Sequence, residues 1–260
     1  MPQPLLSRIR ERRPEGLVTH PDLTTGIGPG PWLCVSPHDD DVAIGMGMIV
    51  AAACAAGIEV HLGVVSDGSM GYPRPEDRAN LAAMRHGELI ESSLRLGIPA
   101  SRVHELKLPD GQLTALRGAH QRPDGNHTGV GWSLTKLIRK VRPRIVFGPT
   151  SADIHPDHQA VSADLDIACF WASSSLWLEL GPKIQLPIRY DYAVYAPFPT
   201  DPHVCVECTS AAQQLKAHSF AAYVSQQYTL DQIITTKPVE YLRRTSWKAY
   251  DPTCYNHLFP

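Results

Sequence analysis

The chain has 260 residues, of which 43% are hydrophobic and 19% are charged, and its formal net charge is −2. This balance is typical of a globular protein with a sizeable core, and the length suits one large α/β domain. The small net charge and the lack of a dense Lys/Arg cluster argue against a nucleic-acid or anionic-membrane partner. The sequence contains no secretory signal pattern and no apolar run of about 18 residues, so we expect a cytoplasmic protein without a membrane span.

The first hundred residues alternate between strand-like and helix-like segments. Residues 1–30 are polar and rich in proline and glycine, which predicts an N-terminal arm with room for one short helix. A buried strand is expected at 31–37, and it is followed by an acidic turn and a helix over 40–57 that ends at a glycine. A second strand is expected at 58–68, and apolar residues at helical spacing predict a long amphipathic helix over 74–97.

The middle of the chain continues the alternation. A third strand and turn are expected at 102–111, and the polar stretch 112–131 predicts a loop. A helix over 132–141 and a fourth strand at 143–150 follow. The segment 151–180 begins with a polar turn and continues as a long helix.

The last third is less regular, with strands expected near 190–197 and 203–209 and a helix over 211–228. Strands that alternate with helices at this spacing indicate βαβ units. The sequence therefore predicts an α/β fold, with a Rossmann-like, mainly parallel sheet flanked by helices, in a single domain over residues 31–260.

Two polar clusters follow predicted strands. The first, after residues 31–37, is SPHDDD, and the second, after residues 143–150, is DIHPDH. In open α/β sheets, functional groups gather at the carboxyl ends of the strands. The two clusters should therefore lie along one edge of the sheet and face each other.

The contents of these clusters fit a zinc site. Zinc binds imidazole nitrogen and carboxylate oxygen, and catalytic sites use three protein ligands. His38, Asp41 and His158 provide such a set, which leaves Asp40 next to the metal as a general base. Each residue alone has an ordinary alternative, since an Asp in this place often caps a helix and a lone His usually makes a structural hydrogen bond. Their joint occurrence at two strand ends is the stronger indication.

Further motifs extend the pattern along the chain. The acidic turn PHDDDVAIGMG and the later HPDH resemble the two signatures of the PIG-L/LmbE-like family of zinc-dependent N-acetylglucosaminyl deacetylases. Three other segments are similar to that family: RHGEL on a helix, LKLPDGQL at a strand and turn, and KAHSFAAYVSQ late in the chain. The resemblance implies an LmbE-like deacetylase domain over residues 31–260 with one Zn²⁺ per chain.

The resemblance also implies roles for individual residues. It gives the metal to His38, Asp41 and His158, and the general base to Asp40. His155 would stand near the reacting carbonyl, oriented by Asp157, and the sugar would be bound by Arg85 and Asp110. The ordinary alternatives are an exposed helix pair of Arg85 with Glu88, and a turn residue at Asp110.

Several positions depart from the family pattern, among them Val42 in place of a frequent Glu and Met48 in place of a glycine, and two further departures concern the polar clusters. Asp39 stands where many members have proline or another uncharged residue, and we expect it to be solvated or to cap the helix. Asp153 stands where some members that act in sugar-thiol pathways have a tyrosine.

Together these features predict a zinc-dependent hydrolase that removes an N-acetyl or similar N-acyl group from an aminosugar or its conjugate. The expected partner is a small N-acetylated sugar or glycoconjugate, and a homo-oligomer is left open. The polar loop at 112–131 is expected to border the site. Two alternatives remain: a non-catalytic carbohydrate-binding protein on the same scaffold, which would have no need of Asp40, and a metal-dependent esterase or phosphoesterase, the latter of a kind that usually holds two metals.

Overall fold

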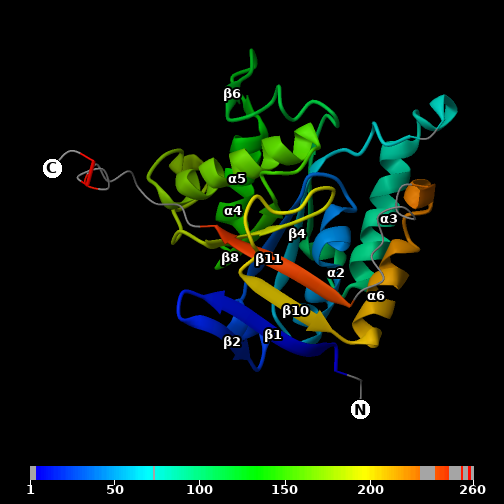
Figure 1. The fold of residues 1–260 in the computed structure, drawn as a ribbon. Coiled ribbons are helices and arrows are strands. Elements are labelled where there is room, and N and C mark those ends of the chain that lie inside the picture. Colours follow the sequence, from blue (N-terminus) through cyan, green and yellow to red (C-terminus); the bar gives the residue numbers. More distant parts are fainter. Residues whose placement is uncertain (1–3, 73, 229–237, 246–252, 254–256, 259–260) are drawn as a thin grey trace.

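The computed structural model describes residues 4–72, 74–228, 238–245, 253 and 257–258. A nine-stranded sheet runs through the molecule with helices on both of its faces (Figure 1). Its strands are β1 (Leu6–Arg13), β2 (Gly16–His20), β3 (Trp32–Ser36), β4 (Val60–Ser66), β5 (Val103–Leu108), β8 (Ile145–Pro149), β9 (Ile188–Tyr192), β10 (Val204–Cys208) and β11 (Val239–Thr245). The helices are α1 (Leu23–Gly26), α2 (Asp41–Ala55), α3 (Leu81–Arg95), α4 (Val130–Val141), α5 (Pro156–Ser173) and α6 (Ser210–Phe220).

The sheet is mixed rather than mainly parallel. Its order is β2-β1-β10-β11-β9-β8-β3-β4-β5. The run from β9 to β5 is parallel, as predicted from the βαβ pattern, whereas the pairs among β2, β1, β10, β11 and β9 are antiparallel. The expected α/β architecture is confirmed, and the antiparallel extension comes from the two ends of the chain.

The N-terminal segment is a correction to the prediction. Residues 1–30 were expected to form an arm, but β1 and β2 form a hairpin. Its strand β1 pairs with β10, so the hairpin is part of the sheet. Ile9 is the one residue of β1 that is buried, while its neighbours include four exposed or half-buried arginines. A strand at this edge exposes most of its side chains, so its sequence lacks the apolar pattern that marked the central strands.

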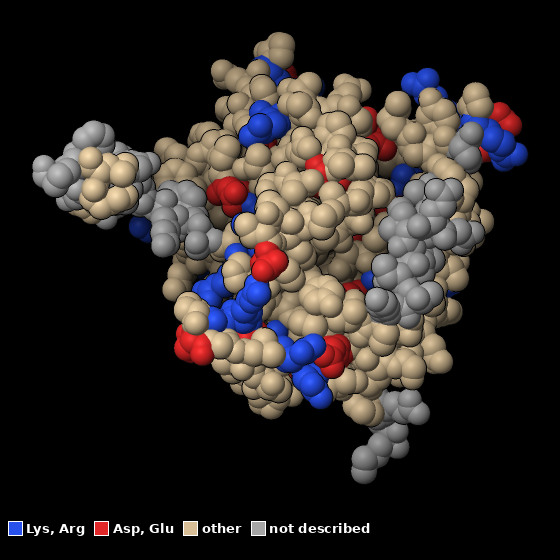
Figure 2. All heavy atoms as spheres, in the orientation of Figure 1, with Lys and Arg blue, Asp and Glu red and all other residues tan. Residues whose placement is uncertain are grey.

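Basic side chains gather on the outer face of the antiparallel strands, in the lower part of the view in Figure 2. Acidic neighbours pair with them: Arg10 pairs with Glu207, and Arg12 Nη1 lies 2.5 Å from Asp201 Oδ2. The charges of these two arginines are therefore offset within the chain.

Two hydrophobic clusters fill the space between the sheet and the helices. One lies between the sheet and the helices α2, α3 and α6, and the other lies between the sheet and the helices α4 and α5 (Figure 1). Among the described helices, none combines the length and apolar character that crossing a membrane requires.

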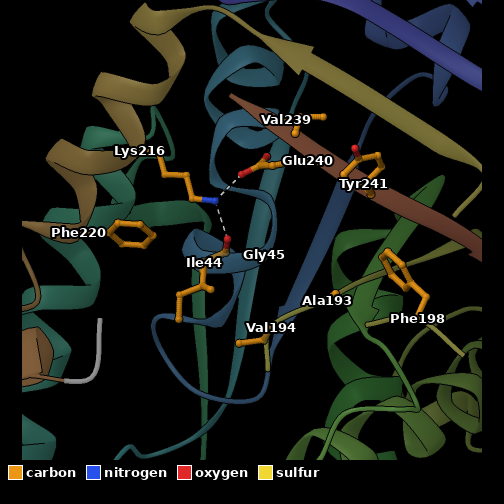
Figure 3. Close-up of a pocket in the computed structure, with 10 residues that line it drawn as sticks. All are labelled: Ile44, Gly45, Ala193, Val194, Phe198, Lys216, Phe220, Val239, Glu240 and Tyr241. Carbon is orange, nitrogen blue, oxygen red and sulfur yellow. Dashed lines mark hydrogen bonds and ion pairs between the residues drawn. The ribbon is translucent and has the colours of Figure 1, made fainter. Parts of the chain in front are cut away.

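Helix α2, which carries the acidic turn, is broken at Met46, where φ is −150°. The break frees the backbone amides of Met48 and Ile49, and both donate to the carboxylate of Glu240 on β11, at 3.1 and 2.8 Å. Lys216 of α6 closes the arrangement, because its Nζ donates to Glu240 and to the carbonyl oxygen of Ile44, each at 2.6 Å (Figure 3). Lys216 and Glu240 are buried, so the break is held by a desolvated ion pair beside a small, mostly apolar pocket of about 160 Å³.

Other predicted elements are confirmed with shifted ends. Helix α3 begins seven residues later than the expected 74–97, after a short 3-10 turn, and α6 ends at Phe220 instead of 228. The loop at 112–131 contains a small hairpin, β6 (His120–Gln121) with β7 (His127–Thr128), whose residues 121–127 are all exposed.

Candidate metal centre and active site

The two predicted polar clusters meet at the carboxyl ends of neighbouring strands. Strand β3 leads into residues 37–41, β8 leads into residues 150–158, and the two strands pair in parallel. The turns therefore emerge side by side at one edge of the sheet, as the sequence predicted. They border an open pocket of about 210 Å³.

Three donor atoms from these turns form an almost regular triangle. His38 Nδ1, Asp41 Oδ2 and His158 Nε2 lie 3.2 Å from one another on all three sides. A tetrahedral ion at about 2.0–2.1 Å from each ligand would separate its ligand atoms by about 3.3–3.4 Å. Asp41 Oδ1 is buried and has no hydrogen-bond partner among the described residues. The three side chains therefore fit a small divalent cation.

The pKa values of these three groups reflect the carboxylates that surround the two imidazoles. Burial disfavours the charged ring of His158, but Asp41 and Asp153 outweigh it and raise the pKa of His158 to about 9. For His38 the balance is similar, because Asp41, Asp110 and Asp157 overcome burial and raise its pKa well above the usual value. Burial alone would raise the pKa of Asp41, but the two imidazoles lower it. A bound cation would take the place of these ring protons.

Each imidazole also has a carboxylate at its other nitrogen. His38 Nε2 lies 3.1 Å from Asp110 Oδ1, and His158 Nδ1 lies 3.2 Å from Asp153 Oδ2. Such partners fix the orientation and tautomer of a metal-binding ring. Asp153 stands where some family members have a tyrosine. It is fully buried, and it also accepts hydrogen bonds from the backbone amides of His155 and Tyr195. This role of Asp153 was not predicted from the sequence.

Asp110 was expected to bind the sugar, and the structure gives both of its oxygens partners within the chain. Oδ1 faces His38 and Oδ2 accepts from the backbone amide of Met70 at 2.9 Å. His38, Asp110 and Asp157 together form a second buried group with potential ligand atoms within 4.8 Å of one another. We interpret this group as support for His38, because the Asp157 carboxylate accepts from the amides of Gly111 and Leu113 at 2.8 and 3.1 Å.

Asp40 has the properties expected of a base beside a cation. It occupies the residue before α2, but its side chain makes no capping hydrogen bond, so the capping alternative is wrong. The side chain is 5% exposed and lines the pocket. Burial, followed by the charge of Asp41, raises the pKa of Asp40 to about 7. A carboxylate in this state can take and return a proton near neutral pH.

His155 lies beside the two imidazoles of the triangle, with potential ligand atoms of all three rings within 4.8 Å of one another. Its ring centre is 4.8 Å from that of His38 and 5.0 Å from that of His158. His155 caps helix α5, where its Nδ1 accepts from the backbone amide of Asp157 at 3.2 Å. Burial and the neighbouring imidazoles lower its pKa, so the ring is neutral and its proton lies on Nε2.

His155 was expected to be oriented by Asp157, and the two residues are in contact. The contact is made by the backbone amide of Asp157, which donates to His155 Nδ1, and not by the carboxylate. The carboxylate points instead toward the turn at 111–113 and toward His38 Nε2, at 3.6 Å. The position of Asp157 at the start of α5 explains this, because its free amide faces back to the capping residue.

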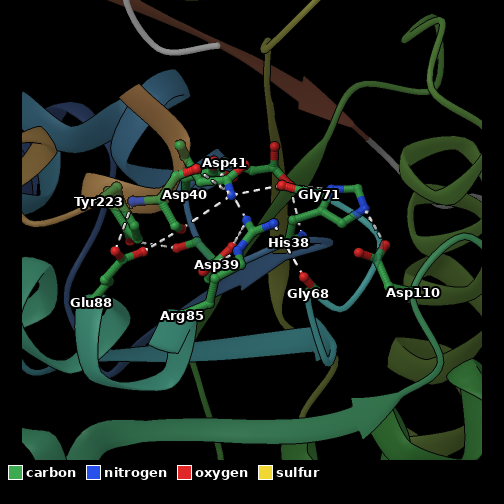
Figure 4. Close-up of polar contacts among 12 residues, drawn as sticks. His38, Asp39, Asp40, Asp41, Gly68, Gly71, Arg85, Glu88, Asp110 and Tyr223 are labelled. Carbon is green, nitrogen blue, oxygen red and sulfur yellow. Dashed lines mark hydrogen bonds and ion pairs between the residues drawn. The ribbon is translucent and has the colours of Figure 1, made fainter. Parts of the chain in front are cut away.

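Asp39 and Arg85 form a pair that the sequence did not predict. Asp39 was expected to be solvated or to cap the helix, but it is 5% exposed and binds Arg85 through both carboxylate oxygens (Figure 4). Arg85 is 4% exposed, so the alternative of an exposed helix pair with Glu88 is wrong. Its Nη2 also lies 3.6 Å from Asp40 Oδ2, and its Nη1 donates to the carbonyl oxygen of Gly68.

The late KAHSFAAYVSQ segment supports the same turn. Tyr223 Oη donates to the carbonyl oxygen of Asp39 at 2.6 Å (Figure 4). Ser225 donates through its amide and hydroxyl to the carboxylate of Glu88, and Gln226 donates to the carbonyl oxygen of Gly71. Segments far apart in the sequence therefore hold the acidic turn in place.

The pocket also contains residues that the sequence analysis missed. Tyr195, which follows β9, has its ring centre 5.2 Å from that of His158, and Met70 and Tyr228 complete the rim. Tyr195 follows the carboxyl end of a third strand, β9, and this position was the feature of the sequence that could have indicated it. The loop at 112–131 was expected to border the site, but no residue of that loop lines the pocket, and its residues Arg117 and Gly118 bind Asp164 of α5 instead.

Comparison with known proteins agrees with this geometry. A family model described as "PIG-L: GlcNAc-PI de-N-acetylase" matches residues 33–168, just over half of the chain. The diacetylchitobiose deacetylase of Thermococcus kodakarensis is 31% identical over 130 residues, which cover 49% of this chain and 44% of that protein. The chain thus spans less than half the length of this curated relative.

Solved structures share the fold over most of the chain. The N,N'-diacetylchitobiose deacetylase from Pyrococcus horikoshii superposes with a TM-score of 0.65 at 24% identity, covering 88% of this chain and 86% of that one. GalB, the 4-carboxy-2-hydroxymuconate hydratase from Pseudomonas putida, superposes with a TM-score of 0.63 at 17% identity, covering 84% and 97%. At these identities the likeness establishes the fold alone.

Proposed function

The chain belongs to the PIG-L family, and from this premise we propose that it is a zinc-dependent amide hydrolase that removes an N-acetyl group from an aminosugar or its conjugate. The observation that carries the proposal is the position of Asp40. It is a buried carboxylate with a pKa near 7 at the edge of a triangle of three metal-binding donors.

His38, Asp41 and His158 would hold the metal, and zinc is the metal we propose. Two imidazole nitrogens and one carboxylate oxygen make a donor set that zinc uses in catalytic sites, where it keeps a position open for water. When bound, the ion would lower the pKa of a water molecule toward about 7 and polarise the acyl oxygen.

The remaining chemistry is performed by side chains of the pocket. Asp40, whose side chain lines the pocket beside the three metal-binding donors, takes the proton of the water that attacks the acyl carbon. Nε2 of His155 carries a proton and can donate a hydrogen bond to the acyl oxygen as negative charge develops there. Asp40, now protonated, then gives its proton to the leaving nitrogen, and the products are acetate and a free amine.

The roles of Arg85 and Asp110 toward the sugar remain predictions. Both side chains line the pocket. Asp110 is engaged with His38, so we propose that it acts mainly through that ring. Arg85 keeps one N–H on Nη1 for a substrate oxygen after its bonds to Asp39 and Gly68.

The likeness to GalB shows that this fold also carries a reaction other than deacetylation, so the fold alone does not choose the chemistry. A non-catalytic sugar-binding protein would have no use for a buried carboxylate beside a metal site. A phosphoesterase usually holds two metals. We therefore favour amide hydrolysis at one zinc. The cytoplasmic location and a homo-oligomer remain predictions.

Release of acetate tests the proposal directly. Purified protein loaded with zinc is incubated with a panel of N-acetylated sugars, including N-acetylglucosamine and N,N'-diacetylchitobiose, and acetate and free amine are measured together. Equal amounts of both products, lost in the Asp40→Asn variant, would support the proposal. Ester or phosphoester hydrolysis without amine release would contradict it, and two tightly bound metal ions per chain would favour the phosphoesterase alternative.

A further inference from the structure

Among the described residues that line the pocket, Arg85 is the one Lys or Arg, and its charge is already neutralised. The ring of His38, which also lines the pocket, faces the carboxylates of Asp41, Asp110 and Asp157. Arg85 Nε donates to Asp39 Oδ2 at 2.7 Å, and Arg85 Nη2 donates to Asp39 Oδ1 (Figure 4). Both residues are at least nine-tenths buried, so water screens the pair little and neither charge is free.

The guanidinium is also fixed in its position. Gly68 and Gly71 pack against it so closely that a Cβ on Gly71 would come within 2.4 Å of Nη1. Arg85 Nη1 donates to the carbonyl oxygen of Gly68, and Tyr223 holds the backbone of Asp39 from the opposite side. A substrate anion could therefore pair with Arg85 only if it displaced a built-in carboxylate.

The rest of the lining adds negative charge. Asp40 and Asp110 are the carboxylates that face the pocket, and Asp39 stands directly behind Arg85. A phosphate or carboxylate on a substrate would meet these groups, and the described lining residues include no Lys or Arg without a carboxylate partner to offset them. Neutral hydroxyl groups, in contrast, can use the N–H that Arg85 retains on Nη1, while its other uncommitted N–H is on Nη2, which lies 3.6 Å from Asp40 Oδ2.

From this geometry we propose that Asp39 is a specificity-determining residue that neutralises Arg85 and so restricts the pocket to uncharged N-acylated sugars, excluding phosphorylated or carboxylated ones. The inference rests on the proposed function, because it assumes that the pocket binds a substrate. The charge state of the pocket can nevertheless be tested by binding measurements alone. Asp39 does not touch the substrate, and it acts through Arg85.

The test compares a neutral sugar with the same sugar carrying a phosphate. N-acetylglucosamine and N-acetylglucosamine 6-phosphate are titrated by calorimetry into the wild type, the Asp39→Asn variant and the Asp39→Asn/Arg85→Gln double variant. The protein is treated with EDTA, so that phosphate cannot bind to a metal. The double variant is the matched control, because it removes both charges and leaves no buried arginine without a partner.

We expect the wild type to prefer the neutral sugar. Asp39→Asn should shift the ratio of the two affinities toward the phosphorylated sugar by about tenfold to a hundredfold, because a freed guanidinium forms charge-assisted bonds with phosphate. The double variant should return the ratio to the wild-type value.

An unchanged ratio in Asp39→Asn, or a wild type that already prefers the phosphorylated sugar, would overturn the proposal. If Asp39→Asn does not fold, the double variant and the wild type still decide, because a lower affinity of the double variant for the phosphorylated sugar would show that Arg85 binds the anion despite Asp39 and would overturn the proposal. Failure of the deacetylase proposal is seen separately, as the absence of acetate release by the zinc-loaded wild type.

Discussion

Replacing Asp40 by Asn should stabilise the metal-free protein and strongly slow turnover by the zinc-loaded protein. Burial and the charge of Asp41 raise the pKa of Asp40 from 3.8 to about 7. A carboxyl group whose pKa is higher in the folded chain binds its proton more tightly there than in the unfolded chain. Its contribution to stability is therefore complete below pH 3.8 and is lost as the pH rises to about 7.

The size of the effect follows from that pKa difference. A rise from 3.8 to about 7 corresponds to about 4 kcal/mol, at about 1.36 kcal/mol for each pH unit. The Asn variant carries no charge to desolvate, although its amide still needs partners. At pH 8 we expect it to exceed the wild type in free energy of unfolding by about 2–4 kcal/mol, with a much smaller difference at pH 4.

Urea unfolding of EDTA-treated protein at the two pH values measures the difference. Asp41→Asn is the matched control, because His38 and His158 lower the pKa of Asp41 and its replacement should destabilise the protein. With zinc bound, the gain from Asp40→Asn should shrink, since the cation attracts the carboxylate. Turnover should fall by a factor on the order of 10²–10⁴, the usual contribution of a positioned base. An Asp40→Asn variant that is less stable than the wild type at pH 8 would refute the reasoning.

Three further outcomes are expected. His158→Ala should lose zinc, measured as metal content after dialysis at sub-micromolar free zinc, and a full equivalent of retained zinc would show that the ligand assignment is wrong. Asp110→Asn should weaken zinc binding by about 10–100-fold through His38, and an unchanged dissociation constant would return Asp110 to the role of a sugar-binding residue. Glu240→Gln leaves Lys216 buried without its partner and should lower the free energy of unfolding by about 3–5 kcal/mol. The double variant Glu240→Gln/Lys216→Met should recover most of that loss. Equal stability of the single and the double variant would contradict this account of the α2 break.

The sequence by itself determined the parallel half of the sheet and the residues of the two polar turns at its edge. Strand β3 is apolar at nearly every position because helices cover both of its faces, and such runs are visible without a structure. His38, Asp41 and His158 could be grouped because parallel strands end at the same edge, and a shared edge follows from topology alone. Distances were not needed to bring these residues together.

Only the tertiary structure decided which neighbours each charged side chain meets. Asp39, Asp40 and Asp41 are adjacent and chemically identical, yet the first pairs with Arg85, the second faces the pocket and the third joins the imidazoles. The partner that each carboxylate meets depends on helix α3, on the segment that contains Tyr223 and on the direction of each side chain at the start of α2. The N-terminal hairpin was hidden for the same reason, because β1 is held in the sheet by β10, some 200 residues away, and contacts at that separation leave no local pattern in the sequence.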